Sequence, residues 1–454
     1  MKRMEWKDLL NSNRYGVLKL SQSSDIRRSY QRDFDRIVFS SAFRRLQDKT
    51  QVFPIPKSDF VHNRLTHSLE VSSVGRSLGS AGGKIILGKE KKTDLRVHPE
   101  SFGDIVAAAC LAHDVGNPPF GHSGEKAIGT YFEQAEGKKH CEYLTEKQYA
   151  ELLNYEGNAS GFRILTNHHP KEKPGGLFLT YATLGAFSKY PAEVEQKGCK
   201  NSNQRTSLKK YGYFQSEDHI FQDVADNLGL IADNEIERNA WRRHPLAFLT
   251  EAADNICYRI IDLEDGHKLG YVSFQEMDEL LRYFLENPEK DTEGLKKYEQ
   301  IQDEGEKVGY LRAKAINKLV GEAASVFEDK YEQIMNGEFD DELTDYILSR
   351  NHFNDKILNK NIQLYNSRKV VEIELAGYKI LGGLLEAFAG ILLKPDSNYN
   401  KKLLELVPAQ FKPEEAEPYY QKIMKMTDFV ARMTDSYAIN LYRKITGISM
   451  PEIY

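Results

Sequence analysis

The amino-acid sequence predicts a mostly α-helical protein with more than one lobe. Apolar residues recur at steps of three and four positions in residues 64–80, 245–263 and 423–441, which is the repeat of one helical face. No Asn-Gly or Asp-Gly turn joins two convincingly alternating strands, and no internal repeat of fixed period is present. A chain of 454 residues exceeds the core of one ordinary domain, so at least two lobes are expected.

Composition and charge narrow the class of protein. Apolar residues make up 40% of the chain and charged residues 28%, which is ordinary for a globular protein. The net charge of −5 gives no sign of a general nucleic-acid-binding surface, and it neither supports nor excludes single-stranded DNA as a regulator. The N-terminal residues lack a hydrophobic signal region. We therefore expect a cytoplasmic protein.

The apolar run from Leu375 to Leu393 is long enough to cross a membrane. Lys379 and Glu386 lie within it, and charged side chains are costly at the centre of a bilayer. The run is therefore predicted to be a buried helix, and no membrane partner is expected.

The first long helix is expected over Arg64 to Ser80. Its apolar face is predicted to carry Leu65, Leu69, Val71, Val74 and Leu78. His67 falls on the face opposite Leu65 and Leu69, where it is available to a site.

A second motif begins with the small apolar residues 105–112, which predict a buried helix. The Gly-Asn-Pro-Pro sequence at 116–119 ends that helix, because proline cannot continue it and disfavours the helical conformation just before itself. His113 and Asp114 stand between the helix and the break. An imidazole beside a carboxylate in this position could provide two of the ligands of a divalent-metal site.

The helix predicted over Pro245 to Leu263 has two ridges. Its apolar ridge carries Leu246, Leu249, Ala253, Ile256, Ile260 and Leu263. Asp254, Tyr258 and Asp262 are four residues apart and lie above one another on the opposite side. A solvated face would mix Lys, Glu and Gln, so we interpret this ridge as the lining of a pocket. Asp254 would complete a metal-ligand set with His67, His113 and Asp114.

The remaining organisation follows from composition. A helix through residues 423–441 is expected to end at Gly447. Three polar stretches are interpreted as loops: Gly82 to Glu100, Pro191 to Lys210, and Asn287 to Gly309. We accordingly predict a catalytic core with an N-terminal segment at 1–285, a charged linker or excursion at 286–310, and at 311–454 a helical lobe that completes the pocket and makes oligomer contacts.

Several sequence blocks, in the same order, resemble the deoxyguanosine triphosphate triphosphohydrolase family of HD-domain metal-dependent phosphohydrolases. Between about Asp35 and Gly266 they are DRIVFSSAFRRLQDKTQVFP, NRLTHSLEVSSVGRSLG, AHDVGNPPFGHSGE, NYEGNASGFRIL, LTYATLGAFSKYP and AADNICYRIIDLEDG. MTDSYAINLYRKITG resembles the closing segment of that family, whereas residues 273–368 carry no diagnostic block. The resemblance implies an all-α HD-domain fold with an additional helical C-terminal lobe.

The resemblance implies that His67, His113, Asp114 and Asp254 are the metal ligands. Two neutral imidazoles and two carboxylates would neutralise a divalent ion and leave positions for water and a phosphate oxygen. Such mixed ligation suits Mn²⁺ or Mg²⁺ and does not exclude iron, nickel or zinc.

His122 and Glu125 resemble the catalytic pair of the family. An imidazole that a carboxylate orients can move a proton between water and a phosphate ester. From the residues alone, a helix-capping or surface histidine would be the simpler interpretation of His122.

The implied reaction is hydrolysis of dGTP, and of other dNTPs as further candidates, to deoxyguanosine and tripolyphosphate. Arg64, Lys189, Tyr190 and Lys210 are the expected phosphate contacts, which makes part of 191–210 a lid rather than inert surface.

The deoxyribose has its own expected contacts. Tyr258 would lie flat against the sugar and exclude a 2′-hydroxyl, while Asp262 and Gln51 would bind the 3′-hydroxyl. Asn158 resembles another pocket position, and a turn or helix cap is the alternative for it. No residue is assigned to the base.

Two other functions stay open from the sequence. The first is another HD-domain nucleotide phosphohydrolase, such as a nucleotidase or phosphodiesterase. The second is a non-catalytic nucleotide-sensing or nucleic-acid-binding protein, against which the intact ligand candidates, His122 and Glu125 argue. A homo-oligomer, tetramer or hexamer, is expected from the resemblance alone.

Overall fold

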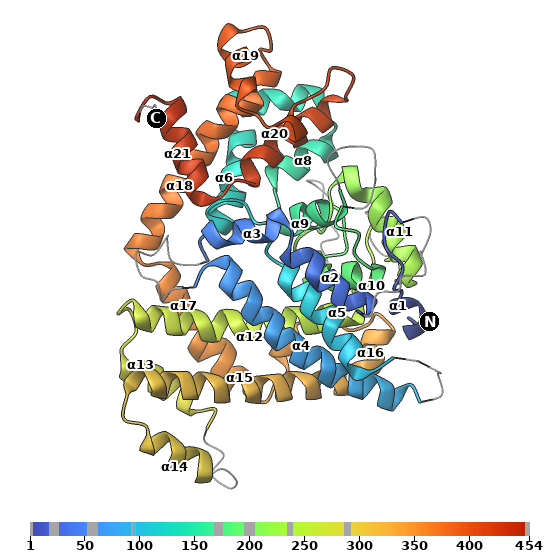
Figure 1. Ribbon diagram of the computed structural model, residues 1–454, viewed down its shortest axis with the longest axis vertical. Coiled ribbons are helices and arrows are strands. Elements are labelled where there is room, and N and C mark those ends of the chain that lie inside the picture. Colours follow the sequence, from blue (N-terminus) through green and yellow to red (C-terminus); the bar gives the residue numbers. More distant parts are fainter. Residues whose placement is uncertain are drawn as a thin grey trace.

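The computed structural model describes residues 3–17, 27–51, 62–91, 95, 97–167, 176–194, 205–233, 239–285 and 292–449. Within these ranges the chain forms helices, and extended pairing is limited to isolated bridges such as Arg14 with Thr180. The predicted all-α class is therefore confirmed (Figure 1).

The helices divide along the chain as follows. Those before residue 240 are α1 (Trp6–Leu9), α2 (Ser29–Val38), α3 (Ser41–Arg45), α4 (Arg64–Lys89), α5 (Pro99–Ala112), α6 (Gly121–Glu133), α7 (Ala135–Lys138), α8 (Glu146–Leu153), α9 (Gly157–Thr166), α10 (Tyr181–Phe187) and α11 (Asp218–Leu228). Those after it are α12 (Pro245–Lys268), α13 (Phe274–Arg282), α14 (Thr292–Gln300), α15 (Glu304–Asp329), α16 (Tyr331–Met335), α17 (Leu358–Tyr365), α18 (Arg368–Phe388), α19 (Asn398–Glu405), α20 (Tyr419–Ala431) and α21 (Asp435–Ile445).

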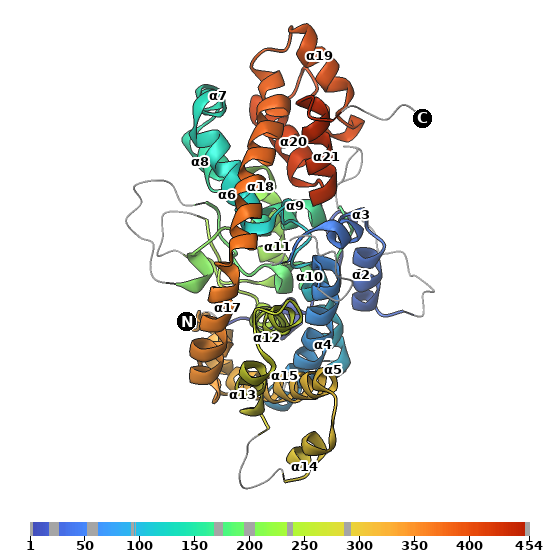
Figure 2. The ribbon, with the colours of Figure 1, turned by 90° about the vertical axis from the view of Figure 1, so that its left-hand side faces the viewer.

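Three helices, α4, α5 and α12, form the centre of the molecule. α12 packs against both α4 and α5 on one side and α15 on another, and Figure 2 shows it end-on between α4 and α17. The apolar ridge predicted for α12 is buried throughout, from Leu246 to Leu263. The polar ridge with Asp254 and Tyr258 faces the cavity described below.

α4 and α5 approach each other closely because glycine occupies the contact. A Cβ at Gly79 would lie 2.7 Å from the carbonyl oxygen of Phe102 and 2.9 Å from the Cα of Gly103. Those neighbours are backbone atoms, which cannot move aside as a side chain can. The close approach sets the separation of the C-terminal half of α4 from the start of α5.

Two expectations for α4 were wrong. The helix continues past Ser80 to Lys89, so residues 82–89 are not part of a loop. Gly82 and Gly83 are buried against α12 and α5, and this packing outweighs the low helix propensity of glycine. Leu69 is 42% exposed, and the buried face instead carries His67 together with Val71 and Leu78.

The C-terminal segment is two helices rather than the single helix expected over 423–441. α20 ends at Ala431, and α21 begins after Thr434, whose side chain accepts a hydrogen bond from the backbone N–H of Tyr437. A threonine cap starts a new helix here, which the apolar repeat alone does not reveal. Gly447 follows α21 with φ +75°, so the predicted end of the helix is confirmed.

α18 is buried along one side only. Leu381, Leu384 and Phe388 are fully buried among α6, α20 and α21, whereas Leu375 is 62% exposed. By length and composition alone, 368–392 could cross a membrane, with mean hydropathy 1.4 and 39% of its most apolar stretch buried. The expectation of a buried helix is thus correct for one face and wrong for the other.

The charged segment expected at 286–310 is largely helical where the structure describes it. α14 and the start of α15 lie within it, and the earlier part of the segment falls outside the described residues. α15 packs on α12 and α4, so residues on both sides of the segment share one apolar core. The three-part division of the chain stays a prediction.

Replacing Gly79 by alanine is expected to destabilise the protein by about 1–3 kcal/mol, because the new methyl group meets backbone on α5. Gly88→Ala on the same helix is the control. Its Cβ would meet nothing within 4 Å, so a neutral effect or a gain of up to about 1 kcal/mol is expected. Urea denaturation measures both changes, and equal effects would contradict this account of the contact.

Candidate metal centre and active site

The end of α5 presents His113 and Asp114 to the interior. α5 is buried from Ile105 to Ala112, and the turn that follows contains Gly116, which lies against the backbone of α9. The side chain of Asn117 donates a hydrogen bond back to Asp114 Oδ1. The predicted helix end and the predicted restart at α6 are both present.

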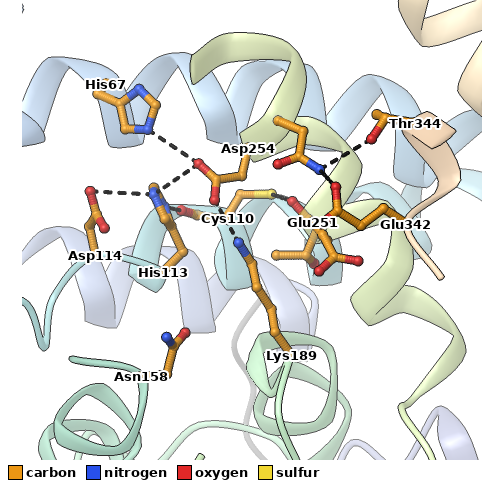
Figure 3. Close-up of polar contacts among 12 residues, drawn as sticks. His67, Cys110, His113, Asp114, Asn158, Lys189, Glu251, Asp254, Glu342 and Thr344 are labelled. Carbon is orange, nitrogen blue, oxygen red and sulfur yellow. Dashed lines mark hydrogen bonds and ion pairs between the residues drawn. The ribbon is translucent and has the colours of Figure 1, made fainter. Parts of the chain in front are cut away.

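His67, His113 and Asp254 converge from α4, α5 and α12 (Figure 3). Their ligand atoms lie within 4.8 Å of one another. Asp254 Oδ1 is 3.3 Å from His67 Nε2 and 3.4 Å from His113 Nε2. Asp114 Oδ2 lies 3.4 Å from the same His113 nitrogen. Three of the four predicted ligands therefore form one group, and the fourth, Asp114, adjoins it through His113.

The donor set fits a divalent metal ion. His113 Nδ1 lies 2.7 Å from the carbonyl oxygen of Cys110, a pure acceptor, so Nδ1 carries a proton. In the neutral ring, Nε2 would then offer its lone pair to a metal ion. Nitrogen from two imidazoles and oxygen from carboxylates is a ligand combination that several divalent ions accept.

Each carboxylate of the cluster is also paired with a cation. Arg64 Nη1 donates to Asp114 Oδ2 at 2.7 Å, and Lys189 Nζ donates to Asp254 Oδ2 at 2.6 Å from the side away from His67 (Figure 3). Burial would raise the pKa of both carboxyl groups, but these cations and His113 hold the pKa of Asp114 and of Asp254 well below the usual range. Both side chains are therefore ionised acceptors.

His122 and Glu125 form a pair on the first turn of α6. His122 Nδ1 lies 2.7 Å from Glu125 Oε2, and the imidazole is 72% exposed while the carboxylate is buried. Glu125 Oε1 accepts a hydrogen bond from the backbone N–H of Gly157 at 2.8 Å. Burial would raise the pKa of Glu125, but His122 and Lys210 lower it, so an ionised carboxylate orients the ring.

A cavity of about 470 Å³ opens in front of the cluster of His67, His113 and Asp254. This volume is that of a typical small-molecule site. Eight of the predicted site residues line it: Gln51, Arg64, His67, His113, Asp114, His122, Asp254 and Tyr258. Val370, Ile373 and Glu374 of α18 line it as well, and the sequence did not point to them.

Asp262 lies behind the cavity wall rather than in it. The carboxyl group is 1% exposed and accepts a hydrogen bond of 2.6 Å from the hydroxyl of Tyr365, which does line the cavity. The Tyr365 ring lies 5.7 Å from that of Tyr258. Burial raises the pKa of Asp262 well above its usual range. Tyr365 was missed because it falls within residues 273–368, where no block is diagnostic.

The other predicted phosphate and pocket residues gather beside Glu156. Lys210 Nζ lies 3.1 Å from Glu156 Oε1, and the Asn158 amide donates to the same oxygen at 2.7 Å. Burial raises the pKa of Tyr190 to about 12. Glu156 was not singled out from the sequence. Residues 195–204 of the expected lid lie outside the described residues.

The comparisons with known proteins agree with this geometry. Residues 64–228 match the HD domain family, a span that holds His67, His113 and Asp114 but ends before Asp254 on α12. The helical fold and the His/Asp cluster thus define an HD-domain phosphohydrolase. The chain belongs, more closely, to the deoxyguanosinetriphosphate triphosphohydrolase family.

Three relatives illustrate the relation. A deoxyguanosinetriphosphate triphosphohydrolase-like protein of Synechocystis sp. is 42% identical over 98% of this chain and 100% of its own length. A protein of the same description from Pseudomonas aeruginosa is 37% identical, over 99% and 100%. The deoxyguanosinetriphosphate triphosphohydrolase of Salmonella typhimurium is 28% identical, over 93% and 94%.

His62 fastens the start of α4 to α12. Its Nδ1 lies 2.8 Å from Asp265 Oδ1, its Nε2 lies 3.1 Å from Glu70 Oε1, and its backbone N–H donates to Asp265 Oδ2. Burial would lower the pKa of His62, but the hydrogen bonds to Asp265 and Glu70 raise it to about 10. The imidazolium therefore helps to place His67, which lies five residues further on in the first turns of α4.

His62→Gln is expected to lower the free energy of unfolding by about 1–3 kcal/mol at pH 6, because charged hydrogen bonds are lost. In the unfolded chain a histidine loses its proton near pH 6.5, whereas the folded protein retains it until about pH 10. The deficit of the variant should therefore be full below about pH 6.5, shrink as the pH rises, and vanish above about pH 10. Urea denaturation at pH 6, 8 and 10 measures this, and a deficit that does not change with pH would contradict it.

Proposed function

We propose that the protein hydrolyses dGTP, and other dNTPs as further substrates, to the deoxynucleoside and tripolyphosphate. The observation that supports this most is the cavity itself. One end holds the His67, His113 and Asp254 cluster, and another wall is formed by Tyr258 and Tyr365 in front of buried Asp262. The residues that would act on the phosphate and the residues that would contact the sugar hydroxyl thus line the same cavity.

In the proposed reaction, the oxygen of a water molecule attacks the α-phosphorus. The bond between phosphorus and the 5′-oxygen breaks, and the deoxynucleoside is the leaving group. The attacking water gives up a proton, the 5′-oxygen takes one up, and the water oxygen stays on the tripolyphosphate. A bound divalent ion, Mn²⁺ or Mg²⁺ by the choice of ligands, would supply charge neutralisation at the phosphate oxygens.

The side chains of the protein divide the remaining work. Glu125 holds His122 by Nδ1, which leaves Nε2 to exchange a proton with the attacking water or the departing 5′-oxygen. Arg64 and Lys189 already stand beside the cluster and would bind phosphate oxygens. Lys210, which contacts Glu156 in the structure, would leave that carboxylate and bind the polyphosphate.

Recognition of the nucleoside follows from the other walls. Tyr258 would cover the face of the deoxyribose and exclude a 2′-hydroxyl. Gln51 and the Tyr365 hydroxyl would contact the 3′-hydroxyl, and Asp262, expected to bind it directly, would instead hold Tyr365 from behind the wall. Glu374 of α18 offers a carboxylate in the same cavity. Guanine presents two neighbouring N–H donors on one edge, which a carboxylate accepts well, so Glu374 supports a preference for dGTP.

The direct test is a hydrolysis panel of the four dNTPs and GTP with Mn²⁺, with products identified by mass. Tripolyphosphate is expected from dGTP, and His122→Ala should lower kcat by about 10²–10⁴-fold with little change in Mn²⁺ affinity. The metal-free protein should be inactive. Release of orthophosphate or pyrophosphate would instead indicate a nucleotidase or phosphodiesterase, and unchanged turnover in His122→Ala would remove that residue from the mechanism.

The exclusion of ribonucleotides has a test of its own. Tyr258→Ala should lower the ratio of kcat/KM for dGTP to kcat/KM for GTP by about 10-fold or more, because loss of the ring makes room for a hydroxyl on the 2′-carbon. Tyr365→Phe is the matched control. It removes the hydroxyl that contacts Asp262 but keeps the ring, so both substrates should suffer alike and the ratio should stay the same. If only Tyr365→Phe changes the ratio, Tyr365 and not Tyr258 excludes the 2′-hydroxyl, and the assignment to Tyr258 is wrong.

A further inference from the structure

Asp435 is a buried carboxylate at the start of α21, in the C-terminal block that the function proposed above does not use. It is 0% exposed. Oδ1 accepts a hydrogen bond of 3.0 Å from the backbone N–H of Phe120, and Oδ2 accepts bonds of 2.9 and 2.6 Å from the backbone N–H and the hydroxyl of Thr50. One side chain thus joins two segments that are 315 and 385 positions away in the sequence.

Both segments end in residues that line the cavity. Thr50 precedes Gln51, the expected contact of the 3′-hydroxyl, and Phe120 lies two residues before His122. Thr50 and Phe120 are themselves part of the lining. The position of either backbone therefore determines where a functional side chain lies.

The turn at Phe120 needs support from outside. Phe120 has φ +63°, a left-handed conformation that residues with a side chain rarely adopt, and Gly121 follows with φ +61°. Its ring packs against Gly377 of α18 on one side. At the next residue, the Arg64 side chain lies so close that a Cβ at Gly121 would be 2.5 Å from Arg64 Nη2. Asp435 provides the acceptor for the backbone N–H of this strained residue.

Neighbouring contacts tie the same parts together. Lys49 donates to the carbonyl oxygen of Asn117, and its Nζ lies 3.5 Å from that of Ala431 at the end of α20. Ser436 donates to Asp48 at 2.9 Å. The joint between α20 and α21 thus meets residues 48–50 and the turn after α5, and Asp435 is the contact that reaches both segments through one group.

We propose that Asp435 is a positioning residue of the active site, which holds the Phe120 turn and Thr50 so that His122 and Gln51 face the substrate. This inference rests on the proposed function for its kinetic consequence. Its structural consequence, a fixed position of the His122 ring, does not depend on the identity of the substrate.

The test uses Asp435→Asn in the full-length protein, because the two side chains have the same shape. An amide has only one acceptor oxygen, so either Phe120 or Thr50 must face an N–H₂ group instead of an acceptor. We expect kcat for dGTP to fall by about 10–100-fold, Mn²⁺ affinity to stay within about twofold, and the NMR resonances of the His122 ring to move.

Thr434→Ala is the matched control on the same helix. It removes the cap of α21 without touching Thr50 or Phe120, so it should lower Tm while kcat and the His122 resonances stay near those of the unaltered protein. If Thr434→Ala reproduces the effects of Asp435→Asn, or if Asp435→Asn leaves both kcat and the resonances unchanged, Asp435 is a structural anchor only.

A double-mutant cycle separates action through His122 from an independent effect. In a His122→Ala background, the residual turnover should fall by less than about threefold on adding Asp435→Asn, because His122, the group that moves the proton, is already absent and only the placement of Gln51 is left to lose. Multiplicative losses would overturn the proposal. If the unaltered protein hydrolyses no dNTP, the proposed function fails, and the His122 resonances still decide the role of Asp435.

Discussion

The close approach of α4 to α5 is the constraint on which the site depends. Glycine on both helices lets their backbones meet, and the geometry of two rigid helices then fixes His67 against His113. Their ring centroids lie 5.3 Å apart, a spacing that flexible loops would not maintain unaided. α12 packs across both helices and adds Asp254, so the metal cluster is a product of helix packing.

The cluster is electrostatically balanced by the same cations that a polyphosphate would need. Asp114 faces Arg64 and Asp254 faces Lys189, and all four side chains are largely shielded from water. An isolated carboxylate in such a place would be costly, so each ionised ligand is paired. His67, His113 and Asp254 would hold a divalent ion, whose charge would give the carboxylates a second partner and leave Arg64 and Lys189 available to phosphate oxygens. Binding of metal and of substrate would therefore favour each other through charge.

The sequence reached the parts of this site that local patterns encode. His113 and Asp114 follow a buried helix with a visible end, and Asp254 and Tyr258 share a ridge opposite a regular apolar face. Spacing therefore marked them as candidates, and the family resemblance suggested their roles. It failed where distant packing decides. Tyr365 meets Asp262 across 103 positions, and nothing in its own surroundings marks it. The break between α20 and α21 is hidden because the apolar repeat of residues 423–441 continues across it in register. On α4, Leu69 fits the apolar repeat of that helix yet faces solvent.

Most of the metal-binding end of the cavity, apart from Asp254, lies within the span that matches the HD domain, and the opposite wall does not. His67, His113 and Asp114 lie within the span that matches the HD domain, whereas Tyr365 and the lining residues of α18 lie beyond it. The wall that would contact sugar and base is supported by buried acceptors, of which Asp262 holds Tyr365 and Asp435 holds Thr50. A substitution in α17 or α18 can then reshape this wall without moving a metal ligand. Substrate choice could then change while the metal ligands stay in place, whereas Asp435, which contacts both Phe120 and Thr50, links this wall to the turn that carries His122.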